Sequence, residues 1–444
     1  MKTQIHKLLK ASVLVLACMG TGMVHAQTVT TSNDAVNNIR PYDQSGINVF
    51  ESPKDSNTVF DGLKLKFGSG FTQTFQSLEH KNVSGGLFAM TPGFNTAQAN
   101  LYMDVQLADG IRLNLTSYLS SRNHNEYWVK GGFIQFDKLP FKGKVWDDIM
   151  KVATITVGHM EINYGDQHFR RTDGGHSLYN PFIENYILDA FTTEIGGEFL
   201  LRKNGVFGLV GATNGMIKGN TNELVPTAAD PNIKKSPAFY AKAGIDKQLT
   251  DILRVRFAGS FYTNSSSGGN TLFGGDRAGS NYFSVMEKVG STGAFSGRLN
   301  PGFSKKVQAY QLNGFVKVQG LELFGTYEAA QGRTKNEVND RKVSQYAMDA
   351  IYRIGRKENL FVGVRYNAVS ARLANVAAAG TVPALVYTKD IKTDRVAFGA
   401  GWFLTKNVLL KGEYVTQQYK DLPVADYRNG GEFNGFVVQA VVGF

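Results

Sequence analysis

Three histidines and a serine are the side chains of this sequence that could support metal binding or nucleophilic catalysis. His159, His168 and His176 are nine and eight residues apart, and Ser177 follows the last of them. Zinc sites combine histidines with cysteines or carboxylates at short, fixed spacings, and no HExxH motif is present. A serine nucleophile needs a histidine base that a third group orients, and the sequence indicates no such group. We therefore expect no metal, no cofactor and no enzymatic activity, with hydrolysis kept as an alternative.

The segment that holds these histidines, residues 159–191, is rich in both charged and aromatic side chains. Its candidate binding residues are Glu161, Asp166, His168, Arg170 and Arg171. Exposing so much apolar surface to water is unfavourable, so we expect the segment to pack inside a larger cavity. There Arg170 and Arg171 would form a positive constriction that attracts carboxylates or phosphates. The alternative is an outer cap whose arginines pair with Asp166 and Asp173.

A second set of charged residues recurs at every other position of otherwise apolar segments. Its basic members include Lys64, Lys66, Arg112, Arg254, Arg256, Arg365 and Arg395, and acidic residues such as Asp104, Glu322 and Asp349 are interspersed. Side chains of a β-strand alternate between its two faces. On a lipid-facing side each Arg or Lys at mid-depth would cost about 2–4 kcal/mol, so we place these residues on an inner, wet face. They would line a pore that weakly favours anions; the alternative is a wall of paired charges that selects nothing.

The elements that carry these residues are predicted to be about sixteen strands. In the stretch LKLKF, for example, Leu65 and Phe67 face one way and Lys64 and Lys66 face the other. Counting all such runs places strand starts near residues 63, 97, 111, 127, 152, 192, 205, 238, 252, 307, 321, 343, 360, 394, 408 and 433. The 49 glycines, 11 prolines and 12% aromatic residues suit many strands joined by tight turns.

The connections between these strands alternate in length. Short ones are expected at 109–110, 203–205, 249–251, 319–320, 355–359 and 405–407, and long ones near 78–96, 160–190, 217–237, 264–305, 331–341, 372–390 and 420–432. Two connections depart from the alternation, 121–126 and 139–151. Short turns at one end and long loops at the other are typical of outer-membrane barrels. We therefore predict an all-β fold, a transmembrane antiparallel barrel with periplasmic turns and extracellular loops.

The last eleven residues, NGFVVQAVVGF, fit the final strand of such a barrel. Phe436, Val438, Ala440, Val442 and Phe444 share one wholly apolar face, which we expect to contact lipid while the strand pairs with the first one. The ending resembles the terminal strand of bacterial outer-membrane proteins, which the barrel-assembly machinery reads. This resemblance implies the same partner for the strand that ends at Phe444.

The N-terminus is predicted to be a cleavable secretory signal peptide, residues 1–26. Three lysines precede a short apolar stretch, and Val24-His25-Ala26 resembles a cleavage site, although Cys18 leaves a lipoprotein signal as an alternative. Residues 27–62 are read as a polar N-terminal extension, and residues 63–444 as the barrel. Removing the signal lysines lowers the net charge from +11 to +8, and this charge is too dispersed for nucleic-acid binding.

Residues 63–444 resemble Gram-negative outer-membrane porins and, more loosely, the phosphate-selective porin superfamily. The resemblance is carried by ITVGHMEINYG, by YNPFIENYILDAFTTEIGGEF and by VFGLVGATNG. It implies an outer-membrane protein that passes small hydrophilic solutes by diffusion, with a lumen narrowed by the 159–191 loop and a preference for phosphate-like or carboxylate solutes. Its partners would be membrane lipid and, as in general porins, two further copies in a homotrimer. A barrel for surface binding, adhesion or secretion remains the alternative.

Overall fold

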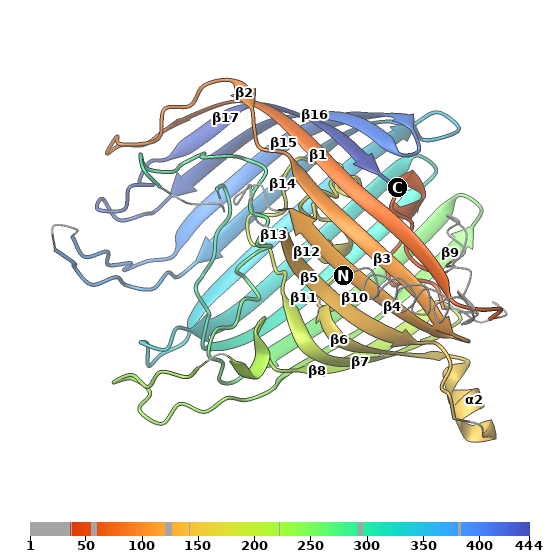
Figure 1. The fold of residues 1–444 in the computed structure, drawn as a ribbon. Coiled ribbons are helices and arrows are strands. Elements are labelled where there is room, and N and C mark those ends of the chain that lie inside the picture. Colours follow the sequence, from red (N-terminus) through yellow and green to blue (C-terminus); the bar gives the residue numbers. More distant parts are fainter. Residues whose placement is uncertain are drawn as a thin grey trace, which may run out of the picture.

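The structure is a computed structural model that describes residues 36, 38–54, 60–119, 127–141, 143–221, 223–291, 296–380 and 383–444. Within these residues the chain forms one antiparallel sheet of sixteen long strands (Figure 1). The strands are β1 (Lys64–Lys81), β3 (Gln98–Ala108), β4 (Ile111–Leu119), β5 (Tyr127–Phe136), β6 (Ala153–Glu161), β7 (Thr193–Lys203), β8 (Val206–Thr213), β9 (Ala238–Thr250), β10 (Leu253–Asn264), β11 (Lys306–Val318), β12 (Leu321–Arg333), β13 (Arg341–Ile354), β14 (Leu360–Ala371), β15 (Ile391–Thr405), β16 (Val408–Lys420) and β17 (Glu432–Gly443). A two-residue strand, β2 (Gly93–Phe94), adds to β1. The predicted signal peptide lies outside the described residues.

The sheet closes on itself because β1 is paired along both edges. Its first half pairs with β3, from Lys64 opposite Gln106 to Thr72 opposite Gln98. Its other edge pairs with β17, from Gly70 opposite Gly443 to Lys81 opposite Glu432. Closure leaves no edge strand whose backbone groups would lack partners in hydrocarbon. The predicted barrel is confirmed, and every predicted strand begins within three residues of the observed one.

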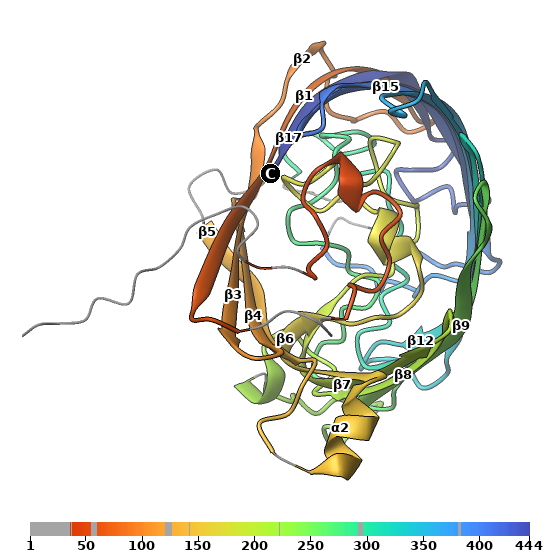
Figure 2. The ribbon, with the colours of Figure 1, turned by 90° about the vertical axis from the view of Figure 1, so that its right-hand side faces the viewer.

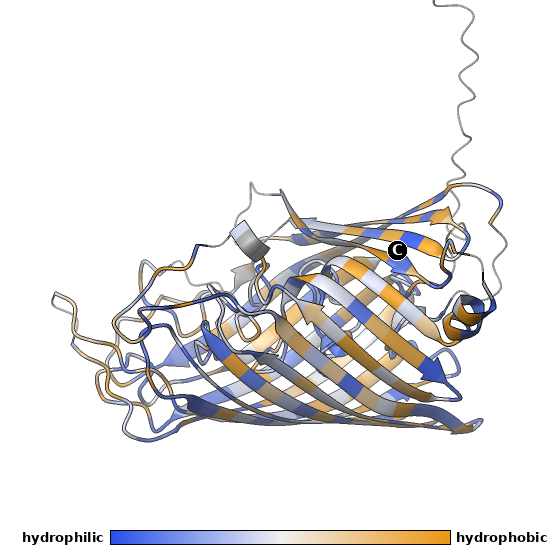
Figure 3. Ribbon diagram, turned by 90° about the horizontal axis from the view of Figure 1, so that it is seen from below, coloured by the Kyte–Doolittle hydropathy of each residue, from blue (hydrophilic) through white to orange (hydrophobic). Residues whose placement is uncertain are grey.

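The outer surface of the barrel is apolar, as the alternation predicts. Figure 3 shows hydrophobic and hydrophilic residues alternating along the strands. On β17, Phe436 and Phe444 are 62% and 52% exposed on the outside, whereas Val437 and Val441 are fully buried on the inside. The terminal strand therefore turns the predicted face outward.

The connections separate by length to the two ends of the barrel (Figure 1). At one end, tight turns join β7 to β8 and β15 to β16, and Asn204 and Gly205 both have the positive φ that a two-residue hairpin turn requires. The long connection 139–151 lies at this same end and contains helix α2 (Lys144–Met150). The connection 121–126 lies outside the described residues. In the described part of the chain, no helix is long and apolar enough to cross a membrane.

The packed core of the protein lies inside the barrel. Figure 2 looks along the barrel and shows chain segments filling much of the space within the ring of strands. The segments that lie inside the barrel are the N-terminal segment (residues 38–54), loop 162–192 between β6 and β7, and the described part of loop 265–305 between β10 and β11. The first carries the 3-10 helix η1 (Gln44–Gly46) and the second η2 (Gln167–Arg170); a third, η3 (Gly219–Thr221), follows β8.

Candidate functional site

Loop 162–192 is fixed inside the barrel by hydrogen bonds from its backbone to inward-facing polar side chains. The amide of Ile183 donates to a carboxylate oxygen of Glu413 (2.9 Å), and the amide of Leu188 donates to the side-chain oxygen of Gln345 (2.9 Å). Buried backbone groups need such partners, and side chains of this irregular loop supply only some of them, as Asn185 does for the amide of Thr172 (2.6 Å). The alternating polar residues of the strands therefore serve as partners for the inserted loop.

Two inward-facing cations hold the same loop through its carbonyl groups. The ammonium group of Lys411 donates to the carbonyls of Ser177, Asn180 and Phe182 at 2.8–2.9 Å. Arg395 donates to the carbonyls of Asn185 (2.7 Å) and of Gly297 in loop 265–305 (2.5 Å). These charges stabilise the inserted loops and are fully buried, so they are shielded from passing solutes.

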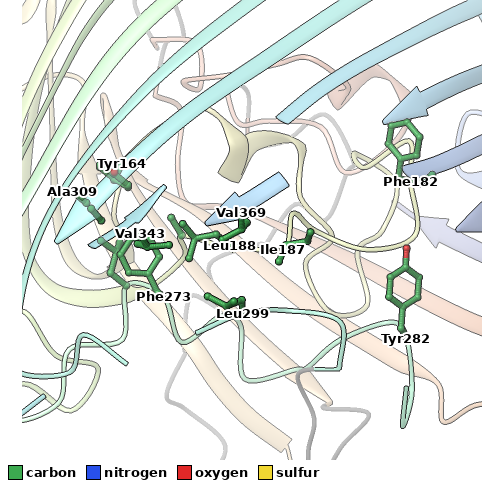
Figure 4. Close-up of a cluster of buried hydrophobic side chains, with 14 of the residues drawn as sticks. Tyr164, Phe182, Ile187, Leu188, Phe273, Tyr282, Leu299, Ala309, Val343 and Val369 are labelled. Atoms are coloured by element: carbon green, nitrogen blue, oxygen red, sulfur yellow. The ribbon is translucent and has the colours of Figure 1, made fainter. Parts of the chain in front are cut away.

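An apolar cluster joins the two inserted loops to the inner wall (Figure 4). Ile187 and Leu188 of loop 162–192 and Leu299 of loop 265–305 lie in this cluster, together with Val343 and Val369 of the strands. All five side chains are at most 4% exposed. Water is therefore excluded from this cluster, because apolar strand residues are covered by apolar loop residues.

The predicted constriction residues Arg170 and Arg171 are buried and paired. Arg171 forms an ion pair with Asp189 (2.5 Å) and approaches Asp276 (3.5 Å), and its guanidinium lies 3.9 Å from the ring centre of Phe191. Burial alone would lower the pKa of Arg171, but the two carboxylates outweigh it and raise the pKa. Arg170 donates to Asn48 and lies 3.7 Å from Glu322. The loop enters the lumen as predicted, but its two arginines bind the protein itself.

The other three predicted residues of the loop also have internal partners. His168 forms hydrogen bonds with Glu161 (2.8 Å) and Asn163 (3.1 Å). Asp166 accepts two hydrogen bonds from Arg256 (both 2.8 Å) and pairs with Lys242 (2.6 Å). A solute-binding role for these residues stays a prediction, and the geometry gives each of them a structural role.

The predicted lining residues all point inward, and most of them pair with carboxylates. The pairs are Arg112 with Asp137 (2.8 Å), Arg254 with Asp246 (2.7 Å), Arg256 with Asp166 (2.8 Å), Arg365 with Asp349 (2.7 Å) and the half-buried Lys64 with the exposed Asp61 (2.7 Å). Lys66 forms no ion pair with any residue that the structure describes, and its ammonium lies 5.9 Å from the ring centre of Tyr42. The sequence correctly predicted that these side chains lie on the inner face. Their ion pairs agree with the alternative interpretation, a wall of paired charges.

A cavity of 230 Å³ remains between the inserted segments and the wall formed by β3, β4, β5 and β6. Its ionisable lining residues are Arg40, Arg112, Lys130, His159, Asp104, Glu161 and Asp173. Lys130 is paired with Asp276 (3.1 Å) and with Asp173, and Asp104 accepts hydrogen bonds from Tyr42 (2.9 Å) and Asn114 (2.7 Å). Cations and anions on this lining nearly balance.

Arg40 is the cavity residue that sequence reasoning missed. Its guanidinium lies 3.6 Å from the ring centre of Tyr179 and donates to the carbonyls of Gly46 (2.9 Å) and Phe169 (2.8 Å). It forms no ion pair within the described ranges, and its Nη1 donates to no group there. Burial lowers the pKa of Arg40 from its ordinary value, but arginine keeps its charge in proteins. Residue 40 lies in a polar, aperiodic segment, so no pattern marked it.

The geometry around His176 does not assemble a nucleophile. Its Nε2 donates to the carbonyl of Tyr42 (2.9 Å), while Nδ1 has no partner in the described residues. The Ser177 hydroxyl instead accepts a hydrogen bond from Thr72 (3.1 Å). Across the residues that were described, no group of three or more His, Cys, Asp or Glu side chains is arranged to hold a metal ion.

Comparison with known proteins supports the fold. No family model matches the sequence, and neither does any curated protein. Among solved structures, the anion-selective porin from Comamonas acidovorans has a TM-score of 0.52 at 12% identity, over 86% of this chain and 100% of that one. The in-vitro folded OmpT, an outer membrane protein of Vibrio cholerae in its trimer form, has a TM-score of 0.50 at 12% identity, over the same shares of both chains. The chain thus has the barrel fold of outer-membrane porins, and identities this low carry no function by themselves.

Proposed function

We propose that this protein is an outer-membrane porin that passes small hydrophilic solutes by diffusion. The observation that carries the proposal is the closed barrel with an apolar outer face and an ionisable inner face. Such a surface pattern suits a protein that is surrounded by lipid and encloses water. The solute path would follow the 230 Å³ cavity, between the β3–β6 wall on one side and loop 162–192 with the N-terminal segment on the other.

The selectivity that we propose is a weak preference for anions. Most inner charges are paired, so their fields largely cancel. Arg40 and Lys66 are cations without an ion-pair partner in the described residues, and Arg40 lines the cavity. The local positive potential at Arg40 would favour anions such as carboxylates or phosphates at that point of the path. The predicted contribution of Arg170 and Arg171 is not part of this proposal, because both are buried in internal pairs.

Export, assembly and oligomeric state complete the proposal. Residues 1–26 would direct export and be removed, and the outward apolar face that ends at Phe444 would be read during barrel assembly. A homotrimer is proposed because a solved barrel of this fold is a trimer. Native mass spectrometry of the purified protein would measure the number of copies directly.

Ion conductance in planar lipid bilayers tests the porin function. Wild-type protein should give stepwise current increases, each from one inserted molecule or oligomer. Thr116→Trp adds a large side chain to the cavity lining and should reduce the step size, because Thr116 lies on the proposed path. Ser344→Trp is the matched control: Ser344 lies on the outward face of β13, beside the exposed Tyr346, and should leave the step unchanged. Equal steps for both variants would contradict the proposed path.

A further inference from the structure

The N-terminal segment contacts strands and turns around most of the inner circumference at the turn end of the barrel (Figure 2). The contacts in chain order are Tyr42 with Asp104 of β3 (2.9 Å), Gln44 with Lys406 of the β15–β16 turn (2.8 Å), Asn48 with Glu322 of β12 (2.6 Å), Glu51 with Arg256 of β10 (2.8 Å) and Lys54 with the carbonyl of Asp137 after β5 (2.6 Å). The segment therefore forms an inner ring that lies across the opening at this end.

We propose that this inner wall is a docking site for residues 38–54, and that the docked segment restricts the pore, so that releasing it opens the pore. This inference rests on the proposed porin function. The docked segment would narrow the same path that loop 162–192 borders, because residues of both line one cavity.

Charge complementarity at Glu51 is the first argument for a built docking site. Its carboxylate accepts hydrogen bonds from both terminal nitrogens of Arg256 (2.8 and 2.9 Å) and lies 3.2 Å from the ammonium of Lys242. All three side chains are at most 5% exposed. Without Glu51, the two cations would share the carboxylate of Asp166 and the more distant Asp246. The wall thus offers a buried positive site, and the segment supplies the matching negative charge.

Aromatic packing is the second argument. Phe50 is 3% exposed, and its ring contacts those of Phe169 and Phe315 at centre distances of 5.6 and 5.5 Å. The guanidinium of Arg256 lies 4.2 Å from the same ring centre. At the other end of the segment, Tyr42 stacks on Tyr102 of the wall at 4.1 Å with an interplanar angle of 6°. Two aromatic anchors therefore fix the segment in a single position.

The segment can leave without disturbing the sheet, because it takes no part in strand pairing. In the described residues, one backbone–backbone hydrogen bond links the segment to the barrel, from the amide of Gln44 to the carbonyl of Lys406. The other hydrogen bonds between the segment and the wall, among the described residues, each involve a side chain. The strands that pair with β1 are, by contrast, held along nine and twelve consecutive residue pairs. Docking and barrel closure are therefore separable.

Trypsin cleavage and bilayer conductance of the full-length barrel test this inference together. Glu51→Gln removes the charge of the segment at the buried site, and Phe50→Ala removes an anchor independently. Glu79→Gln is the matched control, since Glu79 lies exposed on the outer face of β1. Cleavage after Lys54 should become about tenfold faster or more in the first two variants, because a buried contact loses one partner. Their conductance should rise above that of the wild type, and the control should match the wild type in both assays.

An engineered disulfide bond between the segment and the wall completes the test, because it can be formed and broken reversibly. The pair Gln44→Cys and Lys406→Cys joins positions whose backbones are hydrogen-bonded, in a chain whose single native cysteine is Cys18. Oxidation should hold conductance at its restricted level in the Glu51→Gln background, and reduction should raise it. Unchanged cleavage and conductance in both loosened variants would overturn the docking proposal. Faster cleavage with unchanged conductance would overturn the restriction of the pore. Absence of current from every variant would reject the porin function itself.

Discussion

Replacing Arg40 should reduce the anion preference of the pore, and the size of the change follows from the cavity. A sphere of 230 Å³ has a radius of about 4 Å, so an ion at its centre lies about 6 Å from a charge on the lining. In a water-like dielectric two unit charges at this distance interact by about 0.7 kcal/mol, and screening at 0.1 M salt reduces this to about 0.4 kcal/mol. Arg40 attracts anions and repels cations by this amount. The ratio of anion to cation permeability should therefore fall about fourfold to tenfold in Arg40→Met.

The assay is the reversal potential of the open channel in a salt gradient, with two comparison variants. Arg40→Lys keeps the charge and should retain most of the ratio, which separates the charge from the packing on Tyr179. Arg171→Met removes a cation that does not line the cavity, and Arg298 remains 3.2 Å from Asp189, so its ratio should stay within about twofold of the wild type. Removing Arg171 from its buried pair with Asp189 should instead cost about 3–5 kcal/mol of stability. A large loss of selectivity in Arg171→Met together with none in Arg40→Met would refute this reasoning.

Three further outcomes are expected. Phe398→Arg puts a charge on the lipid face, where the side chain of Phe398 is 55% exposed. It should lower the free energy of unfolding by about 2–4 kcal/mol in denaturant titrations of the folded barrel, and no loss would mean that this face does not contact lipid. Arg365→Met breaks the buried pair with Asp349 and should lower the free energy of unfolding by about 3–5 kcal/mol in the same titration. Adding Asp349→Leu should recover part of this loss, and an equal or larger loss in the double variant would contradict the pairing. Burial lowers the pKa of His176 to about 4, below its ordinary 6.5, so the unfolded chain takes up the proton first as the pH falls. The contribution of His176 to stability should therefore be lost between about pH 6.5 and pH 4, by about 3 kcal/mol in total, and His176→Gln should lack this loss; parallel stability profiles of the two proteins in this window would contradict the burial.

The barrel could be predicted from the sequence because its determinants are local and periodic. Alternation within each strand is set by strand geometry, and the need to keep charges out of lipid fixes which face points inward. The apolar content of residues 159–191 correctly placed that loop inside the barrel. The final strand is apolar on its inner face too, at Val437 and Val441. Apolar residues on the inner face indicate that other apolar residues cover them inside the barrel.

The site could not be predicted in the same way because its contacts join distant parts of the chain. Glu51 meets Arg256 across 205 residues, and Asn48 meets Glu322 across 274. Asn48 and Glu51 belong to no periodic pattern, so the sequence indicates only that residues 27–62 form a polar extension. Arg171 illustrates the related error for charge: the sequence shows a cation in a loop, but only the fold shows that Asp189 and Asp276 neutralise it.

The most direct test of the porin proposal is single-channel recording of the purified, folded barrel in a planar bilayer with a salt gradient. Stepwise ohmic currents are expected, with a reversal potential displaced modestly toward the anion side. A barrel that is shown to be folded by its resistance to denaturation in detergent, yet passes no current at any voltage, would contradict the proposed function.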